Sequence, residues 1–111
     1  MGKRSNLREM FEKQRNFQTR LGNESILYHI PFIKDQVLAL QCELMEALQE
    51  TPWKAWKKNQ VLDVKKLQNE IIDVWHFLIN ISMASGLDEK SLFELFMKKN
   101  RINNKRQDEG Y

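Results

Sequence analysis

The sequence predicts an all-α protein, with four helices that form a bundle in a single domain over residues 1–111. Apolar residues recur three and four positions apart in four separate stretches, which is the spacing of one helix face. No stretch alternates apolar and polar residues as a half-buried strand would, and the chain has only four glycines and two prolines. A chain of 111 residues can bury one core, and association with a second copy would strengthen it.

The first two helices are bounded by residues that interrupt a helix. The first is expected over residues 7–21 and stops where Gly22 breaks the apolar pattern. The second begins at Pro31, because proline suits a first helical position. It ends before Pro52, because the residue that precedes a proline resists the helical conformation.

The last two helices are separated by a short turn. The third begins near Val64 and stops at Gly86, which can serve as its C-terminal cap. Asp88 can accept hydrogen bonds from the free amides that start the fourth helix. Asn, Arg, Gln and Gly then replace the periodic apolar residues, so residues 100–111 are expected to form a polar, basic tail.

Composition and charge narrow the possible environments of the chain. No apolar run approaches the roughly 20 residues of a membrane span, so we expect a cytoplasmic protein without membrane contact. The single cysteine, Cys42, cannot form an internal disulfide and is expected to be a small buried thiol. The net charge is +3, and a basic cluster near the C-terminus could bind a phosphate-bearing partner or simply face water.

Two acidic pairs are the most informative residues of the chain. Glu43 and Glu46 lie three positions apart in the second expected helix, and Glu70 and Asp73 do so in the third, so each pair shares a helix face. Both pairs border an apolar stripe and should point toward a neighbouring helix or a cleft. Four gathered carboxylates need a counter-charge, and a hard divalent cation such as Mg²⁺ is the usual one. The alternative, that these are ordinary solvent-facing residues, suits either pair alone better than both pairs followed by His76.

A magnesium site of this kind favours phosphate chemistry. Mg²⁺ bridges carboxylates to substrate phosphates, and a spare carboxylate beside the metal could accept a proton from an attacking water. Lys99, Arg101 and Arg106 of the tail would then complete a cradle for the phosphates.

Three aromatic residues near these pairs each allow two interpretations. Trp53 and Trp56 follow the end of the second helix and are expected to seal a pocket or a subunit interface, with core packing as the alternative. His76 follows Asp73 by one turn, and it could instead be a histidine at the core edge that is hydrogen-bonded to a neighbour.

Four blocks of the sequence occur in an order that points to a known family. They are Phe17-Gln18-x-x-Leu21-Gly22, then Glu43-x-x-Glu46 with Glu50-Thr-Pro-Trp-Lys-x-Trp-Lys-Lys58, then Glu70-Ile-Ile-Asp73-Val-Trp-His76-Phe77, then Lys99-Asn100-x-x-Asn103-x-x-Arg106-Gln107-x-x-Gly110-Tyr111. Together they resemble the dimeric dUTPases of the all-α nucleoside triphosphate pyrophosphatase superfamily, which also includes the MazG-like enzymes. The acidic pairs alone indicate only the superfamily, whereas the third and fourth blocks are more specific to the dUTPase branch.

The resemblance implies a cytoplasmic homodimer that hydrolyses dUTP to dUMP and diphosphate with Mg²⁺, or with Mn²⁺ in its place. By the family pattern, Glu43, Glu46, Glu70 and Asp73 hold the metal, and Glu46 orients or deprotonates the attacking water. The tail, about residues 100–111, closes over the active site. The pattern also places the uracil beside Gln18, Trp53 and Phe77, the deoxyribose beside His76, and the phosphates and sugar beside Lys99, Asn103 and Arg106.

Several alternatives remain open at the level of the sequence. Gly22 stands where many members of the family have asparagine near the uracil, so dCTP or a broader set of deoxynucleotides is the alternative substrate. A di-iron carboxylate bundle would need a carboxylate-x-x-His motif on each of two helices, and this chain has only Asp73-x-x-His76. A non-catalytic helical binding module is the alternative from another class, but the complete carboxylate set argues against it. We expect no stable binding of nucleic acid.

Overall fold

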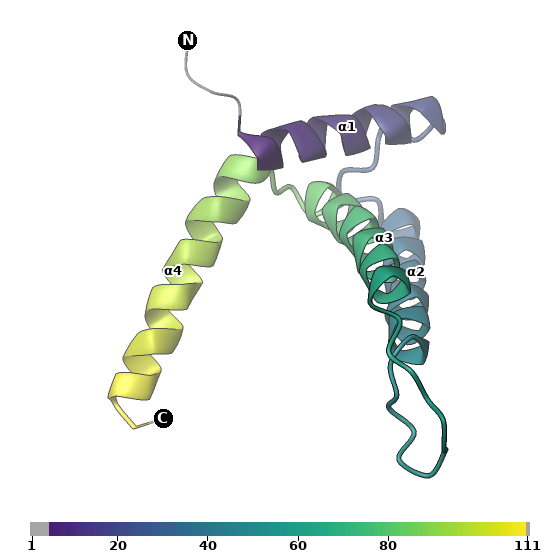
Figure 1. Cartoon of the computed structure of the whole chain (residues 1–111). Helices are drawn as coiled ribbons and strands as arrows, with labels where there is room; N and C mark the ends of the chain where they lie inside the picture. Colours follow the sequence, from purple (N-terminus) through teal and green to yellow (C-terminus); the bar gives the residue numbers. More distant parts are fainter. Residues whose placement is uncertain (1–4, 111) are drawn as a thin grey trace.

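The computed structural model describes residues 5–110, which contain four α-helices and no strand. The predicted all-α class and the four predicted helices are therefore confirmed. In chain order the helices are α1 (Asn6–Arg20), α2 (Ile30–Gln49), α3 (Val64–Ala84) and α4 (Glu89–Asp108) (Figure 1).

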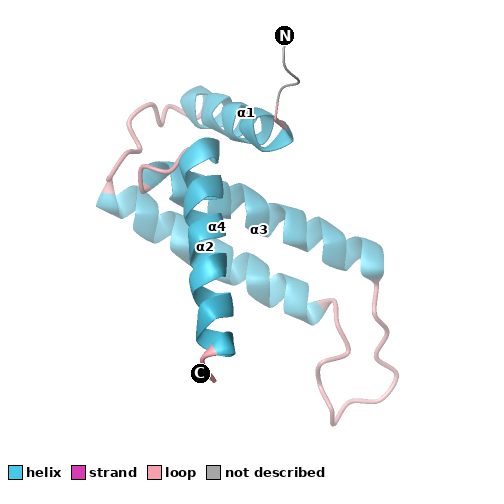
Figure 2. Cartoon of the chain, turned by 90° about the vertical axis from the view of Figure 1, so that its left-hand side faces the viewer, coloured by secondary structure: helices cyan, strands magenta, loops and turns pink. Residues whose placement is uncertain are grey.

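The most extensive packing in the chain joins α2 and α3. These helices lie side by side and run in opposite directions, connected by the long loop 50–63 (Figure 2). Helix α1 lies across the end of α3 that is remote from this loop (Figure 1). A small apolar core forms there from Phe11, Ile26, Ile79, Met83 and Ala84.

Local hydrogen bonds and turn geometry explain where the helices begin and end. Asp88 caps α4 as predicted: its carboxylate accepts from the Ser91 amide at 2.7 Å, and the Ser91 hydroxyl accepts from the Asp88 amide at 3.0 Å. Gly86 follows α3 with a φ of +92°, and a Cβ there would lie 2.7 Å from the Tyr28 hydroxyl oxygen, so the turn requires glycine. Pro31 lies in the first turn of α2, as expected.

The predicted C-terminal tail is wrong in its local structure. Residues 100–108 continue α4 without interruption, and the side-chain amide of Asn104 donates to the Asn100 carbonyl one turn earlier at 3.0 Å. Lysine, arginine and glutamine are good helix formers, so the loss of apolar periodicity does not end the helix. Tyr111, which closes the fourth resemblance block, lies outside the described residues.

The four helices do not close into a compact bundle within one chain. Helix α4 diverges from the α2–α3 pair and packs on α1 (Figure 1). The radius of gyration is 17.6 Å, whereas a compact domain of about 100 residues has a value of about 13 Å. Large apolar side chains stay open on α4 as a result, with Phe93 61% and Phe96 64% exposed.

Two further expectations can be compared with the fold. Cys42 is exposed, so the prediction of a buried thiol is wrong. It precedes Glu43, which faces α3, by one position, or about 100° around the helix. Within residues 5–110, no helix combines the length and the apolar character needed to cross a bilayer.

Candidate metal centre and adjoining hollow

The two acidic pairs meet where α2 faces α3. Glu43 and Glu46 from α2 and Glu70 from α3 each contribute a carboxylate oxygen, and these three oxygens lie within 4.8 Å of one another. We call these three residues the acidic cluster. Asp73 lies outside this group, although its charge acts on Glu43 and Glu70. The structure therefore brings together three of the four predicted metal ligands and places the fourth beside them.

The acidic cluster contains polar atoms that the chain itself does not satisfy. Among the described residues, no hydrogen-bond partner reaches the buried Oε2 atoms of Glu43 and Glu70. A buried carboxylate oxygen without a partner is costly. Carboxylate oxygens at this spacing are the donors that Mg²⁺ and Mn²⁺ prefer. The residues present therefore fit the predicted divalent cation.

The proton affinity of the acidic cluster is also unusual. Burial raises the pKa of Glu43 from 4.5 to about 7, and the carboxyl groups of Glu46, Glu70 and Asp73 contribute in the same direction. Burial also raises the pKa of Glu70; the carboxyl groups of Glu46 and Asp73 add to that rise, whereas the carboxyl group of Glu43 opposes it. The metal-free cluster therefore resists full ionisation near neutral pH, and a bound cation would favour the ionised form.

This proton affinity predicts how the stability of the metal-free protein depends on pH. Because the pKa of Glu43 is higher in the folded chain, the folded state binds more protons between about pH 4.5 and about pH 7. The free energy of unfolding should therefore fall as the pH rises through this interval. Melting temperatures measured in EDTA should show that fall, and saturating Mg²⁺ should reduce it.

Two variants make this measurement specific. Glu43→Gln removes the titrating group and should flatten the fall in melting temperature. Asp35→Asn removes an exposed carboxylate from the same helix and should leave the fall unchanged. A melting temperature that rises over this interval in the wild type, or an identical slope in Glu43→Gln, would contradict the assignment.

A hollow of about 490 Å³ adjoins the acidic cluster through Asp73. It contains three of the predicted substrate-binding residues, namely Gln18, His76 and Phe77. Gln18 is only 5% exposed, and its Oε1 accepts a hydrogen bond from Asn23 at 3.0 Å. The lining carries aromatic rings and an unusual number of side-chain amides, and we call it the amide-lined hollow: Gln14, Phe17, Gln18, Leu21, Asn23, Gln36, Asp73, His76, Phe77 and Asn80.

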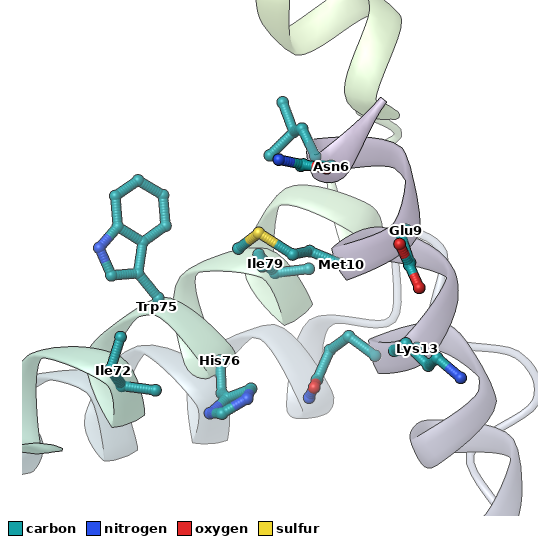
Figure 3. A pocket seen from close by; sticks show the side chains of 10 residues that line it. Asn6, Glu9, Met10, Lys13, Ile72, Trp75, His76 and Ile79 are labelled. Carbon is teal, nitrogen blue, oxygen red and sulfur yellow. The ribbon is translucent and has the colours of Figure 1, made fainter. Parts of the chain in front are cut away.

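His76 lies at the boundary between this hollow and a second one. The second hollow has a volume of about 670 Å³ and lies between α1 and α3. Figure 3 shows Met10 from α1 close to Ile79 from α3, with Glu9 and Lys13 also on α1. His76 is exposed there, so it is open to a ligand from either hollow.

The remaining predicted substrate residues do not reach this site within one chain. Trp53 lies in loop 50–63, where its ring meets that of Trp56 edge to face with centroids 5.7 Å apart. Trp56 is 75% exposed, which rules out core packing for it. The other three, Lys99, Asn103 and Arg106, lie on the part of α4 that diverges from α2 and α3 (Figure 1).

The structure adds residues that sequence patterns did not single out. Lys65 and Lys66 border a hollow of about 540 Å³ together with Glu50 and Glu70, so two cations lie beside the acidic cluster. The sequence spacing could have indicated Lys66, since it precedes Glu70 by four positions and therefore shares its helix face. Gln14 and Gln36 were also missed, because nothing in their local sequence indicates which helix they face.

Two curated relatives match this chain. The dCTP pyrophosphatase of Enterobacteria phage T4 is 30% identical over 71 residues, which cover 53% of this chain and 42% of that protein. The dCTP pyrophosphatase of Enterobacteria phage LZ5 is 37% identical over 71 residues, with coverage of 53% and 41%. These matches thus span about two fifths of each relative's length. No solved structure matches the chain.

A family profile described as dUTPase matches residues 6–90. This match runs from the first turn of α1 to the first turn of α4 and includes both acidic pairs, Gln18 and His76. The fourth resemblance block, from Lys99 onward, lies beyond it. On this match the chain belongs to the dimeric, all-α dUTPase family.

Proposed function

We propose that this chain is a nucleoside triphosphate pyrophosphohydrolase that converts dUTP or dCTP to the monophosphate and diphosphate with Mg²⁺. The observation that carries the proposal is the acidic cluster, whose buried oxygens have no partner in the described chain, next to a hollow lined with amides and aromatic rings. Membership of the dUTPase family and the names of the two phage relatives support this reaction class, and together they favour neither pyrimidine.

Glu43, Glu46, Glu70 and Asp73 would hold the cation. When bound, Mg²⁺ would offset the negative charge of the substrate phosphates and make water easier to deprotonate. Mn²⁺ prefers the same oxygen ligands and should substitute for it. Glu43 and Glu70 are half-buried where α2 faces α3, which suits them to holding the cation.

Glu46 is the carboxylate best placed to act as a base, because it is the exposed member of the acidic cluster. We propose that it accepts a proton from the water that attacks the α-phosphorus. A bond forms from the water oxygen to that phosphorus, and the bond from phosphorus to the oxygen bridging to the β-phosphate breaks. Diphosphate leaves with the electron pair of the broken bond. Lys65 and Lys66 lie beside the acidic cluster, where their positive charges would attract the negatively charged diphosphate.

The amide-lined hollow is the proposed site of the base. Asn80 follows Asp73 by seven residues on α3, so the far end of the hollow lies about 10 Å along the helix from Asp73. A nucleotide carries its base and its α-phosphate at opposite ends of a deoxyribose, and it therefore needs two neighbouring sites of this kind. Phe77 and Phe17 offer faces for a planar ring, and the amides offer partners for its edge.

A homodimer is part of the proposal. The open shape of one chain and its exposed apolar residues on α2, α3 and α4 leave more apolar surface than a stable monomer usually shows. Helix α4, which carries Lys99, Asn103 and Arg106, diverges from the α2–α3 pair that holds the acidic cluster. We therefore propose that α4 of one subunit completes the phosphate site of the other.

The direct test is the release of diphosphate from each deoxynucleoside triphosphate, with Mg²⁺ and with EDTA. We expect magnesium-dependent release from dUTP, from dCTP or from both, and little release from the purine nucleotides. Hydrolysis of dUTP alone would make the chain a strict dUTPase, and hydrolysis of dCTP alone a dCTPase. Absence of release from any nucleotide would contradict the proposal and favour a binding role.

A further inference from the structure

Three side-chain amides form a hydrogen-bonded relay that links three helices. The Nε2 of Gln14 on α1 donates to Oδ1 of Asn80 on α3 at 2.8 Å. The Nδ2 of the same Asn80 donates to Oε1 of Gln36 on α2, also at 2.8 Å. Asn80 is 2% exposed and Gln14 is 8% exposed, so most of the relay is shielded from water.

The relay fixes the direction of each amide in it. An amide offers donors on its nitrogen and an acceptor on its oxygen, and burial penalises either group if it has no partner. Once Asn80 uses its oxygen toward Gln14 and its nitrogen toward Gln36, the oxygen of Gln14 and the nitrogen of Gln36 are left for other partners. Reversing one amide would require all three to reverse.

Both ends of the relay line the amide-lined hollow, in which Asp73 marks the side of the metal centre. We propose that Asn80 is a positioning residue that orients Gln14 and Gln36 toward the pyrimidine ring and thereby sets the preference between cytosine and uracil. This inference rests on the proposed function. Cytosine presents an amino donor and a ring nitrogen acceptor where uracil presents a carbonyl acceptor and a ring N–H donor. The direction in which each amide points decides whether it offers the base a donor or an acceptor, and therefore which of the two bases it matches.

Two substitutions place an acceptor at the same end of the relay. In Asn80→Asp the carboxylate can only accept, so Gln36 must turn its nitrogen toward residue 80 and its oxygen toward the hollow. In Gln36→Glu the carboxylate still accepts from Asn80 and offers its second oxygen to the hollow. The two variants should therefore shift base preference in the same direction.

The experiment measures kcat/KM for dCTP and for dUTP in the wild type, in both variants and in Gln41→Glu. The control makes the same change of charge at an exposed position of α2. We expect each relay variant to change the ratio of the two kcat/KM values by about tenfold or more, because an acceptor replaces a donor at one position that faces the base. We expect Gln41→Glu to leave the ratio at the wild-type value.

The outcomes separate this inference from the proposed function. If the wild type hydrolyses a pyrimidine nucleotide but neither variant changes the ratio, the relay is structural and the inference is wrong. An equal loss on both substrates together with a lower melting temperature would likewise show a structural role. Shifts of opposite sign in the two variants would also overturn the inference. If Asn80→Asp fails to fold, Gln36→Glu decides alone, since Gln36 is only half-buried. A wild type inactive on every nucleotide overturns the proposed function and this inference with it.

Discussion

Replacing Glu46 with glutamine is expected to lower kcat for the preferred nucleotide by about a thousandfold, because a general base contributes about 10²- to 10⁴-fold to the rate. Glutamine keeps the size of the side chain and one oxygen, but it cannot accept a proton from water at neutral pH. Glu46 is the exposed member of the acidic cluster, so the change should leave the packing of α2 on α3 unaltered. Steady-state diphosphate release, together with circular dichroism and a melting curve, measures both parts of the prediction.

Matched variants separate the role of Glu46 from that of the other carboxylates. Asp35→Asn removes an exposed carboxylate from the same helix and should keep activity near that of the wild type. Glu43→Gln and Asp73→Asn should also abolish turnover, but they should in addition weaken Mg²⁺ binding measured by calorimetry. A Glu46→Gln enzyme within tenfold of the wild type would show that another group accepts the proton. Full activity in both Glu43→Gln and Asp73→Asn would contradict the metal assignment.

The acidic cluster was accessible to sequence reasoning because its signal is local. The three-residue spacing of Glu43 and Glu46, and of Glu70 and Asp73, places each pair on one helix face whatever the rest of the chain does. The antiparallel packing of α2 on α3 then brings the faces together. Spacing could not reveal that Asp73 stands at the edge of the group, because that depends on the register between the helices.

Features that depend on distant parts of the chain were not predictable in the same way. Gln14 and Asn80 are 66 positions apart, and no local pattern indicates that their amides meet. Apolar periodicity does not locate the end of α4, because the helix continues beyond its last periodic apolar residue. Residues 100–108 are all exposed, yet their composition and backbone hydrogen bonds sustain the helix. The exposure of the apolar side chains of α4 was also not predictable, since a single sequence does not show which faces a second copy would cover.

Mixing two inactive variants is expected to restore about a quarter of wild-type activity if α4 of each subunit serves the site of its partner. One variant is Glu46→Gln, which lacks the proposed base. The other carries Lys99→Ala and Arg106→Ala, which remove two cations from α4. Each homodimer alone should be inactive or nearly so, and sedimentation should confirm that both are dimers.

The expected recovery follows from the arrangement of the subunits. Random reassociation makes about half of the dimers mixed, and in a mixed dimer one site combines an intact acidic cluster with an intact α4 from the other subunit. If α4 instead served its own chain, each site of a mixed dimer would carry one of the two defects, and no activity would return. Unfolding and refolding the variants separately before mixing controls for activity gained by refolding alone. Activity of an isolated monomer, or an α4 variant that binds nucleotide as tightly as the wild type, would contradict a shared site. Recovery would instead explain why one chain leaves α4 extended and its apolar face open: the position of α4 is set by the partner subunit, on which its basic residues act.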